Sequence, residues 1–138
     1  MTTTEYRKPV PQPDEESAPY FDGAKRGELM IRRCKSCRAY LAPSAERCDM
    51  CLDTDPQWVK ASGKGTLHTF GLMHQMYHPA WQDEMPYNIA TVELAEGPRL
   101  VANIVDCPND QLTVGMAVEA VFDAVTPDVT IVRFRPAR

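Results

Sequence analysis

The sequence predicts a mainly β fold in which a short N-terminal helix and a four-cysteine, rubredoxin-like ribbon precede a five-stranded barrel. Three observations lead to this prediction: two C-x2-C pairs between residues 34 and 51, five short strand-like stretches after Gly63, and no long helical pattern in the 138 residues. The expected organisation is a flexible arm over 1–16, the helix and ribbon over 17–60, and the barrel over 61–138.

The N-terminal residues predict an extended arm followed by one helix. Three prolines within residues 9–13 favour an extended and mobile chain. Ser17 is a good N-cap and Pro19 suits the first helical turn, while Gly27 can end a helix. The expected helix therefore runs over about residues 18–26.

Four of the five cysteines carry the strongest signal in the sequence. Two C-x2-C pairs separated by ten residues can form two knuckles that bring four sulfurs to one tetrahedral Zn²⁺: Cys34, Cys37, Cys48 and Cys51. Iron in the same thiolate cage is an alternative. Two disulfides would suit a secreted chain, and a redox C-x-x-C needs only one pair. Four cysteine ligands leave no open coordination position, so the predicted metal is structural and not catalytic.

The residues around these cysteines predict a ribbon with little core of its own. Strands are expected over 29–33, 39–42 and 58–60, and so short a ribbon buries too little apolar surface to fold without its metal. Arg38 and Leu52 follow the knuckles, where glycine is common because the chain often needs a positive φ. Five nearby cations are expected to offset the thiolate charge, with a phosphate-binding patch as the alternative: Arg32, Arg33, Lys35, Arg38 and Arg47.

From Gly63 onward the pattern changes to short alternating strands. Turn residues separate these stretches, as Glu96-Gly97-Pro98 and Thr126-Pro127-Asp128 illustrate. Strands are expected over 66–73, 87–94, 99–105, 117–122 and 129–134. Five strands in a short segment without a long helix predict a small closed barrel of the OB type.

The segment 74–86 does not fit a strand, and it is long for a hairpin loop. It carries apolar side chains of the kind that dominate protein interfaces, and these are the expected partner contacts: Met76, Tyr77, Trp81 and Met85. The alternative is that the loop folds over the mouth of its own barrel. His74 and His78 are four residues apart, but they make only a weak metal pair, because Pro79 follows them directly and no third ligand is present. Cys107 is expected to be a small packed residue and not a nucleophile.

The charge distribution argues against nucleic acid as a partner. Residues 1–65 carry 11 basic and 10 acidic side chains, and residues 66–138 carry 4 and 9, so nets of +1 and −5 give −4 overall. Nucleic-acid affinity comes mainly from cationic contacts with phosphates. No apolar run approaches the roughly 18 residues of a membrane span, and the polar N-terminus does not resemble a secretory signal. We therefore expect a cytoplasmic protein that binds neither nucleic acid nor membrane.

Several motifs occur in an order that is typical of one family. Beside the two cysteine pairs stand Ser62-Gly63-Lys64-Gly65, Pro86-Tyr87 and Glu96-Gly97. With them, nearly all of residues 17–138 resembles the acyl-CoA-associated zinc-ribbon/OB-fold family, long catalogued as a domain of unknown function. This combination is much more specific than C-x2-C pairs alone.

The resemblance implies a noncatalytic accessory subunit. Members of this family accompany thiolases, thiolase-like aldolases or hotdog-fold hydratases, and they complete or stabilise the partner's acyl-CoA site, in some cases in lipid or steroid side-chain degradation. The partner's own residues then do the chemistry. Acyl-CoA would be bound jointly with the partner, and the nearest candidates for contacts to its phosphates are Lys60, Lys64, Arg32 and Arg33.

Three classes of function stay open at this point. An accessory subunit of a thiolase-like enzyme fits the motifs, and the sequence contains no evident nucleophile–base pair, phosphate loop or open metal site. A nucleic-acid-binding zinc-ribbon/OB-fold protein is the alternative, but it needs a basic barrel face. The barrel half offers few cations for such a face: Arg99, Arg133, Arg135 and Arg138. A stand-alone enzyme is the third class, and we expect instead a hetero-oligomer whose other subunit is catalytic.

Overall fold

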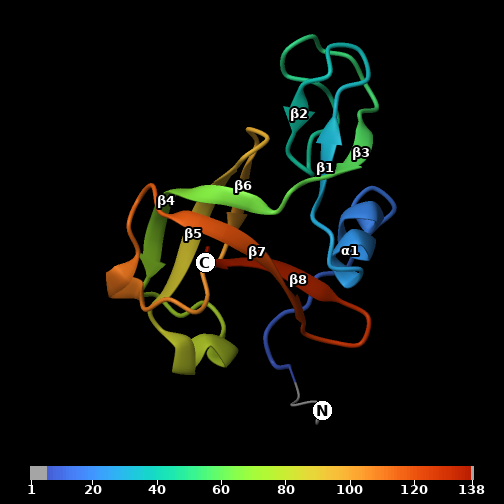
Figure 1. Cartoon of the computed structure of the whole chain (residues 1–138). Coiled ribbons are helices and arrows are strands. Elements are labelled where there is room, and N and C mark those ends of the chain that lie inside the picture. Colours follow the sequence, from blue (N-terminus) through green and yellow to red (C-terminus); the bar gives the residue numbers. More distant parts are fainter. Residues whose placement is uncertain (1–5, 138) are drawn as a thin grey trace.

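The structure, a computed structural model, describes residues 6–137 and confirms the mainly β fold with a helix, a ribbon and an OB-type sheet (Figure 1). Residues 1–5, the start of the predicted arm, lie outside the described residues. The N-terminal part holds α1 (Ala18–Lys25), β1 (Met30–Arg33), β2 (Tyr40–Leu41) and β3 (Gln57–Lys60). The sheet and its connections hold β4 (Lys64–Met73), η1 (Pro79–Glu84), β5 (Tyr87–Leu94), β6 (Arg99–Ala102), η2 (Asn109–Gln111), β7 (Ala117–Ala124) and β8 (Thr130–Pro136).

Helix α1 begins where the sequence predicted, but Ser17 does not cap it in the expected way. Ser17 already has helical dihedral angles, and its side chain makes no capping hydrogen bond to the helix. The turn starts earlier, because the Ser17 N–H donates to the Asp14 carboxylate at 2.9 Å and the Ala18 N–H donates to the Asp14 carbonyl at 2.8 Å. Asp14 therefore provides the capping carboxylate, a role its residue type suits.

The ribbon is a three-stranded antiparallel sheet in the order β2-β1-β3. Its knuckles have the backbone geometry for which glycine is usual, since Arg38 has φ 68° and Leu52 has φ 66°. A non-glycine residue in this left-handed region costs about 1 kcal/mol. Figure 1 shows the ribbon extending away from the barrel, with α1 beside its base.

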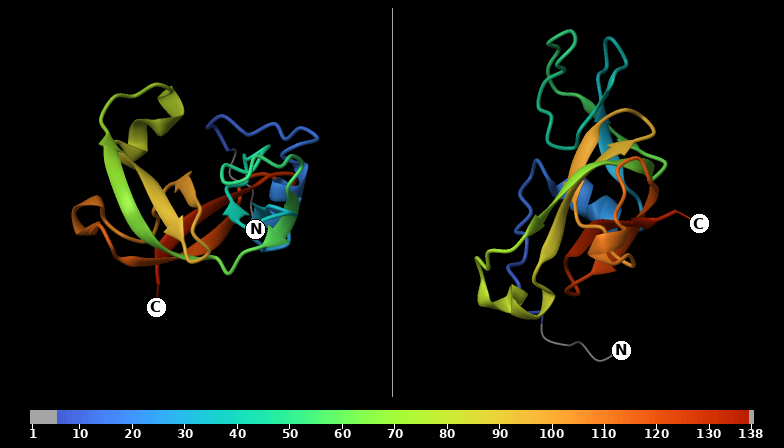
Figure 2. Two further views of the ribbon diagram at one scale, coloured as in Figure 1. Left: turned by 90° about the horizontal axis from the view of Figure 1, so that it is seen from above. Right: turned by 90° about the vertical axis from the view of Figure 1, so that its left-hand side faces the viewer.

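The five barrel strands form one curled antiparallel sheet in the order β6-β5-β4-β7-β8 (Figure 2). The predicted third strand, 99–105, ends early, because residues 103–105 leave β5 and bond to β8 instead. The Phe134 N–H donates to the Asn103 carbonyl at 3.1 Å, and the Val105 N–H donates to the Phe134 carbonyl at 2.7 Å. A parallel bridge between Ile104 and Phe134 thus joins the two edges of the half-barrel.

The Ser62-Gly63-Lys64-Gly65 motif joins the ribbon to the barrel. The Ser62 N–H donates to the Glu96 carboxylate at 2.7 Å, so two motifs of the sequence resemblance meet at this junction. Gly65 lies so close to β5 that a Cβ there would stand 2.5 Å from the Glu93 carbonyl oxygen. Gly63 has φ 80°, which a side chain would disfavour. These constraints explain why small residues occupy the entry to β4.

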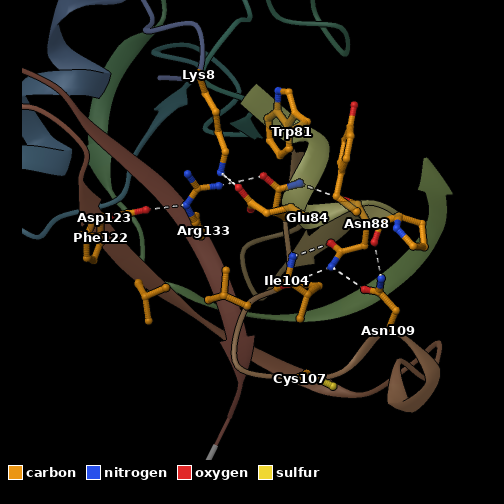
Figure 3. A pocket seen from close by; sticks show the side chains of 15 residues that line it. Lys8, Trp81, Glu84, Asn88, Ile104, Cys107, Asn109, Phe122, Asp123 and Arg133 are labelled. Carbon is orange, nitrogen blue, oxygen red and sulfur yellow. Dashed lines mark hydrogen bonds and ion pairs between the residues drawn. The ribbon is translucent and has the colours of Figure 1, made fainter. Parts of the chain in front are cut away.

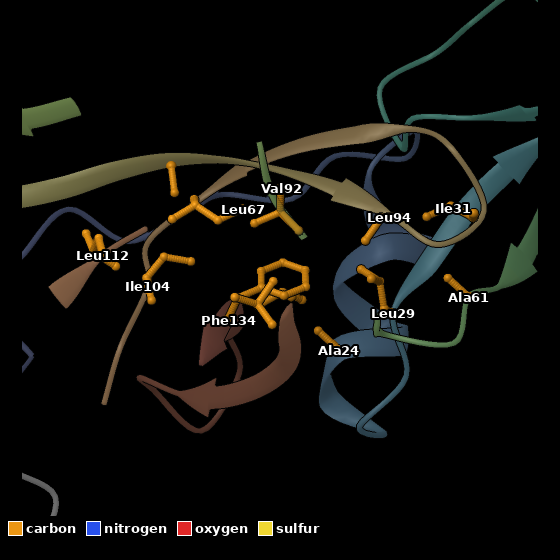
Figure 4. Packing of buried hydrophobic residues seen from close by; sticks show 13 residues of the cluster. Ala24, Leu29, Ile31, Ala61, Leu67, Val92, Leu94, Ile104, Leu112 and Phe134 are labelled. Carbon is orange, nitrogen blue, oxygen red and sulfur yellow. The ribbon is translucent and has the colours of Figure 1, made fainter. Parts of the chain in front are cut away.

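One apolar core connects the helix, the base of the ribbon and the barrel (Figure 4). Phe134 lies at its centre and is fully buried, and Ala24 from α1, Ile31 from β1 and Leu67 from β4 belong to the same cluster. Burying a side chain such as Phe134 contributes about 1.5–3 kcal/mol. The tip of the ribbon is separate from this core and has a much smaller cluster of buried residues: Cys34, Leu41 and Cys48. The base of the ribbon is therefore held by the barrel, whereas its tip is not.

Candidate functional site

The fold brings the four predicted ligands together at the tip of the ribbon. Their sulfur atoms all lie within 4.8 Å of one another, with Cys34 Sγ 3.5 Å from Cys51 Sγ and Cys37 Sγ 3.5 Å from Cys48 Sγ. These separations are far longer than the roughly 2.05 Å of a disulfide bond. The cysteines are therefore free thiols arranged as one cluster, and the disulfide alternative does not fit.

The cluster has the dimensions that a tetrahedral zinc ion needs. Zn–S bonds of about 2.3 Å place neighbouring sulfurs roughly 3.8 Å apart. The observed spacing fits this tetrahedron, and the thiolate donor set suits zinc or iron. Among residues 6–137 no other group of three or more histidine, cysteine or acidic side chains is placed to hold a metal.

Backbone N–H groups of the knuckles point at the sulfurs. The Cys37 N–H donates to Cys34 Sγ at 3.4 Å, and the Met50 N–H donates to Cys48 Sγ at 3.3 Å. The bond from the Cys37 N–H favours the charged form of its acceptor and lowers the pKa of the Cys34 thiol to about 6. Contacts with the neighbouring sulfurs raise the pKa of Cys37 to about 12, so binding of a metal by thiolates at this cluster would release protons.

Two of the five cations that flank the ligands are engaged with the ribbon itself. The Arg32 guanidinium lies 4.6 Å from the centre of the Trp58 ring and donates to the Pro56 carbonyl at 2.6 Å. Arg33 lies over the Tyr40 ring in the same way and donates to the Arg38 carbonyl. These contacts stabilise the strands that carry the knuckles, so the arrangement favours the structural interpretation of this charge cluster over a phosphate-binding patch.

The four predicted partner contacts in the loop 74–86 differ in their exposure. Tyr77 and Met76 are exposed, with 71% and 47% of their surfaces accessible. Trp81 lies on η1 and stacks on Tyr87 of β5 with ring centres 4.2 Å apart. Met85 is half-buried at the end of η1. The loop thus both folds over its own barrel and presents two apolar side chains outward, and the partner-contact role of all four remains a prediction.

The barrel face beneath η1 contains a cavity of about 520 Å³ (Figure 3). Asn88 of β5 is almost completely buried in its wall. Its side chain donates to the Ile104 carbonyl at 2.9 Å and accepts from the Ile104 N–H at 2.7 Å. Asn109 accepts a second bond from the same amide group at 3.2 Å. Sequence reasoning missed these residues, and the one available signal was an asparagine inside a strand pattern.

Replacing Asn88 with alanine is expected to destabilise the barrel by about 2–4 kcal/mol. The substitution leaves the buried N–H and carbonyl of Ile104 without their partners, and such groups are costly to leave unpaired. Urea unfolding of the two proteins measures the difference. Gln111→Ala, at an exposed side chain nearby, should change stability by less than about 0.5 kcal/mol. Equal stabilities for Asn88→Ala and the unchanged protein would contradict this reading of the network.

The other candidate residues have ordinary structural surroundings. His78 Nδ1 accepts a hydrogen bond from the Ala80 N–H at 3.1 Å and caps η1, and His74 is exposed beside it. Cys107 is half-buried against the main core. Lys60 forms an ion pair with Glu28 at 3.8 Å.

The barrel cations also have acidic partners. Arg99 pairs with Glu93, Arg133 with Asp123, and Arg135 with Glu119, at N···O distances of 2.8 to 3.7 Å. Local pairing neutralises the charges that a phosphate backbone would need. Within residues 6–137 no helix combines the length and apolar character required to cross a membrane.

Two family models match this chain. Residues 21–57 match the rubredoxin-like zinc ribbon domain of ChsH2, and residues 58–123 match its C-terminal OB-fold domain. A probable enoyl-CoA hydratase alpha subunit of Thermomonospora curvata is 37% identical over 130 residues, which are 94% of this chain and 40% of that protein. This chain therefore spans well under half of that relative's length.

Two further relatives have lengths closer to that of this chain. A DUF35 domain-containing scaffold protein of Methanocaldococcus jannaschii is 39% identical over 97 residues, covering 70% of this chain and 68% of that protein. A solved structure titled Ltp2-ChsH2(DUF35) aldolase superposes with a TM-score of 0.81 at 37% identity. It covers 93% of this chain and 99% of the matched one.

Proposed function

This chain belongs to the ChsH2 zinc-ribbon/OB-fold (DUF35) family, and on that premise we propose that it is a noncatalytic accessory subunit of a thiolase-like acyl-CoA enzyme. In this role it binds the catalytic subunit and helps to complete or stabilise that subunit's acyl-CoA site. The observation that carries the proposal is the similarity to the DUF35 chain of an aldolase, along 99% of that chain's length.

The geometry of the chain supports a docking role. Four of its five cysteines form one closed cluster at the ribbon tip, and His78 is used as a helix cap. The exposed Met76 and Tyr77 stand on a loop next to a concave barrel face, where a second subunit can reach them. The relative described as a scaffold protein points in the same direction.

The proposal includes two ligands. A structural Zn²⁺ is held by the four cysteines, where it would replace the core that the ribbon tip lacks. An acyl-CoA thioester is bound jointly with the partner, and the family resemblance favours a lipid or steroid side-chain substrate. Among the cations predicted to meet its phosphates, Lys64 is exposed, whereas Arg32 and Lys60 already have partners within the chain.

A nucleic-acid-binding role is the alternative, and the charges support it less. Residues 66–138 of this chain, which form the barrel half, carry a net charge of −5. Arg99, Arg133 and Arg135 in this half are paired with carboxylates. Binding to single strands needs free cations and exposed aromatic rings along one groove. Submicromolar, salt-sensitive binding of an oligonucleotide by the purified chain would favour this alternative.

Affinity purification from the source cell with the tagged full chain as bait tests the proposed function. We expect a thiolase-like subunit to copurify, and we expect acyl-CoA turnover by the reconstituted complex but not by this chain alone. The tag without the chain is the control for capture. Turnover by this chain in the absence of any partner would overturn the accessory role, as would a reconstituted catalytic subunit whose activity is the same with and without it.

A further inference from the structure

Residues 6–13 cross the face of the barrel between η1 and α1 without forming a helix or strand. Three of their side chains are half-buried, Tyr6, Lys8 and Pro11, while the others are exposed. The segment therefore presents one side to the barrel along its length. We call residues 6–13 the strap.

Lys8 anchors the strap to η1 (Figure 3). Its ammonium group forms an ion pair with Glu84 and lies 4.5 Å from the centre of the Trp81 ring. Only 16% of the Lys8 side chain is exposed, which is unusual for a lysine. Trp81 thus contacts both the Tyr87 ring and the Lys8 ammonium group, and the lysine covers part of the Trp81 ring.

Pro11 continues the contact into a second cavity, of about 370 Å³. This cavity is lined mainly by apolar side chains, including Tyr20 and Phe21 of α1 and Val101 of β6. It shares Trp81, Tyr87 and Asn103 with the larger cavity that Lys8 lines, so the two are adjacent parts of one groove. An aromatic-lined groove is the kind of surface that binds extended, proline-rich segments.

The attachment of the strap is weak enough to be reversible. Among the described residues, no backbone hydrogen bond joins residues 6–13 to the rest of the chain. Pro9, Pro11 and Pro13 have no N–H to donate. The anchoring ion pair is half exposed on its Glu84 side, and solvent screening makes the contribution of such a pair to stability small. Local opening of so few contacts costs far less than unfolding the barrel.

We propose that the strap is an intramolecular ligand of this groove, which covers part of the groove in the free chain and leaves it when the catalytic subunit docks. The class of ligand that this groove binds is then an extended segment that contains proline and, next to it, a cationic side chain. Its occupant in the free chain is residues 6–13. The displacement step rests on the proposed function, whereas the closed strap in the free chain does not.

Trypsin cleavage after Arg7 measures the closed strap, because Lys8, which follows the cleaved bond, is held against η1 and has to leave it before the bond can enter the protease. Glu84→Ala removes the anchor, and we expect cleavage of the full chain to become about three- to fivefold faster, the factor that the loss of one half-exposed ion pair allows. Asp83→Ala is the matched control, since Asp83 is the exposed neighbouring acid and is not the partner of Lys8. Equal cleavage rates for the two variants would overturn the proposal.

Acrylamide quenching of Trp81 supplies a second measurement of the closed strap. In a Trp58→Phe background it reports on one ring, and we expect the quenching constant to rise about twofold in Glu84→Ala and to stay unchanged in Asp83→Ala. Unchanged quenching in both variants would contradict a strap that covers the ring.

Affinity for the copurified catalytic subunit tests the displacement step. We expect Glu84→Ala to bind it about three- to fivefold more tightly than Asp83→Ala does, because less free energy is needed to open the groove. Equal or weaker binding by Glu84→Ala would overturn displacement. Failure of every variant, and of the unchanged chain, to bind any catalytic subunit would instead count against the proposed function, while the protease result would still decide whether the strap is closed.

Discussion

Replacing Cys34 with serine will empty the metal site and unfold the tip of the ribbon while the barrel keeps its structure. Cys34 is buried, its sulfur lies 3.5 Å from that of Cys51, and it belongs to the tip's small buried cluster with Leu41 and Cys48. A cluster of this size cannot offset the conformational entropy of ordering the knuckles, so the free energy of metal binding is the free energy of folding there. The expected loss is most of the tip's stability.

Metal analysis and amide-resolved NMR of the reduced protein measure this result. The unchanged chain should hold one equivalent of Zn²⁺, and Cys34→Ser well under one. Resonances of about residues 34–56 should then collapse toward unfolded positions, while those of β4 to β8 persist. Cys107→Ser is the matched control, because Cys107 lies away from the cluster and should retain full metal content. A fully metallated Cys34→Ser protein, or an unchanged chain purified without metal, would contradict the assignment.

The extent of this unfolding is where the structure changes the sequence-based expectation. From the sequence, the whole ribbon over 29–60 would depend on the metal. The structure places Leu29 and Ile31 in the main core with Phe134 and Leu94, so the base of the ribbon is stabilised by apolar burial that the metal does not supply. We therefore expect residues 29–33 to remain ordered when the metal is removed.

Local patterns predicted the features that depend on local spacing. The two C-x2-C pairs predicted that the four cysteines would come together, and their sulfurs do lie within 4.8 Å of one another, because each knuckle is only a few residues long. The alternating stretch over 87–94 predicted β5 with its observed bounds, since one face of that strand is buried. Short-range periodicity was sufficient in both cases.

Features that depend on contacts between distant segments could not be predicted in this way. The sequence does not say that residues 103–105 pair with β8, because that choice is made by the curl of the whole sheet. It does not show that Asn88 will bond to Ile104, sixteen residues away. The strap is a similar case, since Lys8 meets Glu84 only because η1 and the N-terminal segment fold onto the same barrel face.

The structure also changes which residues of the loop 74–86 are the best candidates for contact with the catalytic subunit. Sequence composition treated the four apolar residues of 74–86 as equivalent partner anchors. The structure distinguishes Trp81, which already contacts Tyr87 and Lys8 within the chain, from Tyr77 and Met76, whose side chains are exposed. A side chain contributes most to the binding free energy when its surface is exposed before docking and buried afterwards. Tyr77 is therefore the better candidate for a large contribution to binding.

Tyr77→Ala is therefore expected to weaken the complex with the catalytic subunit by tens of fold without changing the stability or metal content of this chain. Tyr77 is 71% exposed, so its removal leaves no cavity, whereas burying its ring at the centre of an interface can contribute about 2 kcal/mol or more. Calorimetric titration of the two purified subunits measures the affinity. Urea unfolding and metal analysis confirm that the variant is otherwise intact.

Val114→Ala is the matched control for this prediction, because Val114 is also apolar and exposed but lies outside the loop 74–86. It should bind the catalytic subunit as tightly as the unchanged chain does. Trp81→Ala adds a second comparison, since it removes contacts within the chain as well and should lower stability together with affinity. If Tyr77→Ala and Met76→Ala both bind the catalytic subunit with unchanged affinity, the loop is not the docking surface, and the interface must be sought on another face of the ribbon or barrel.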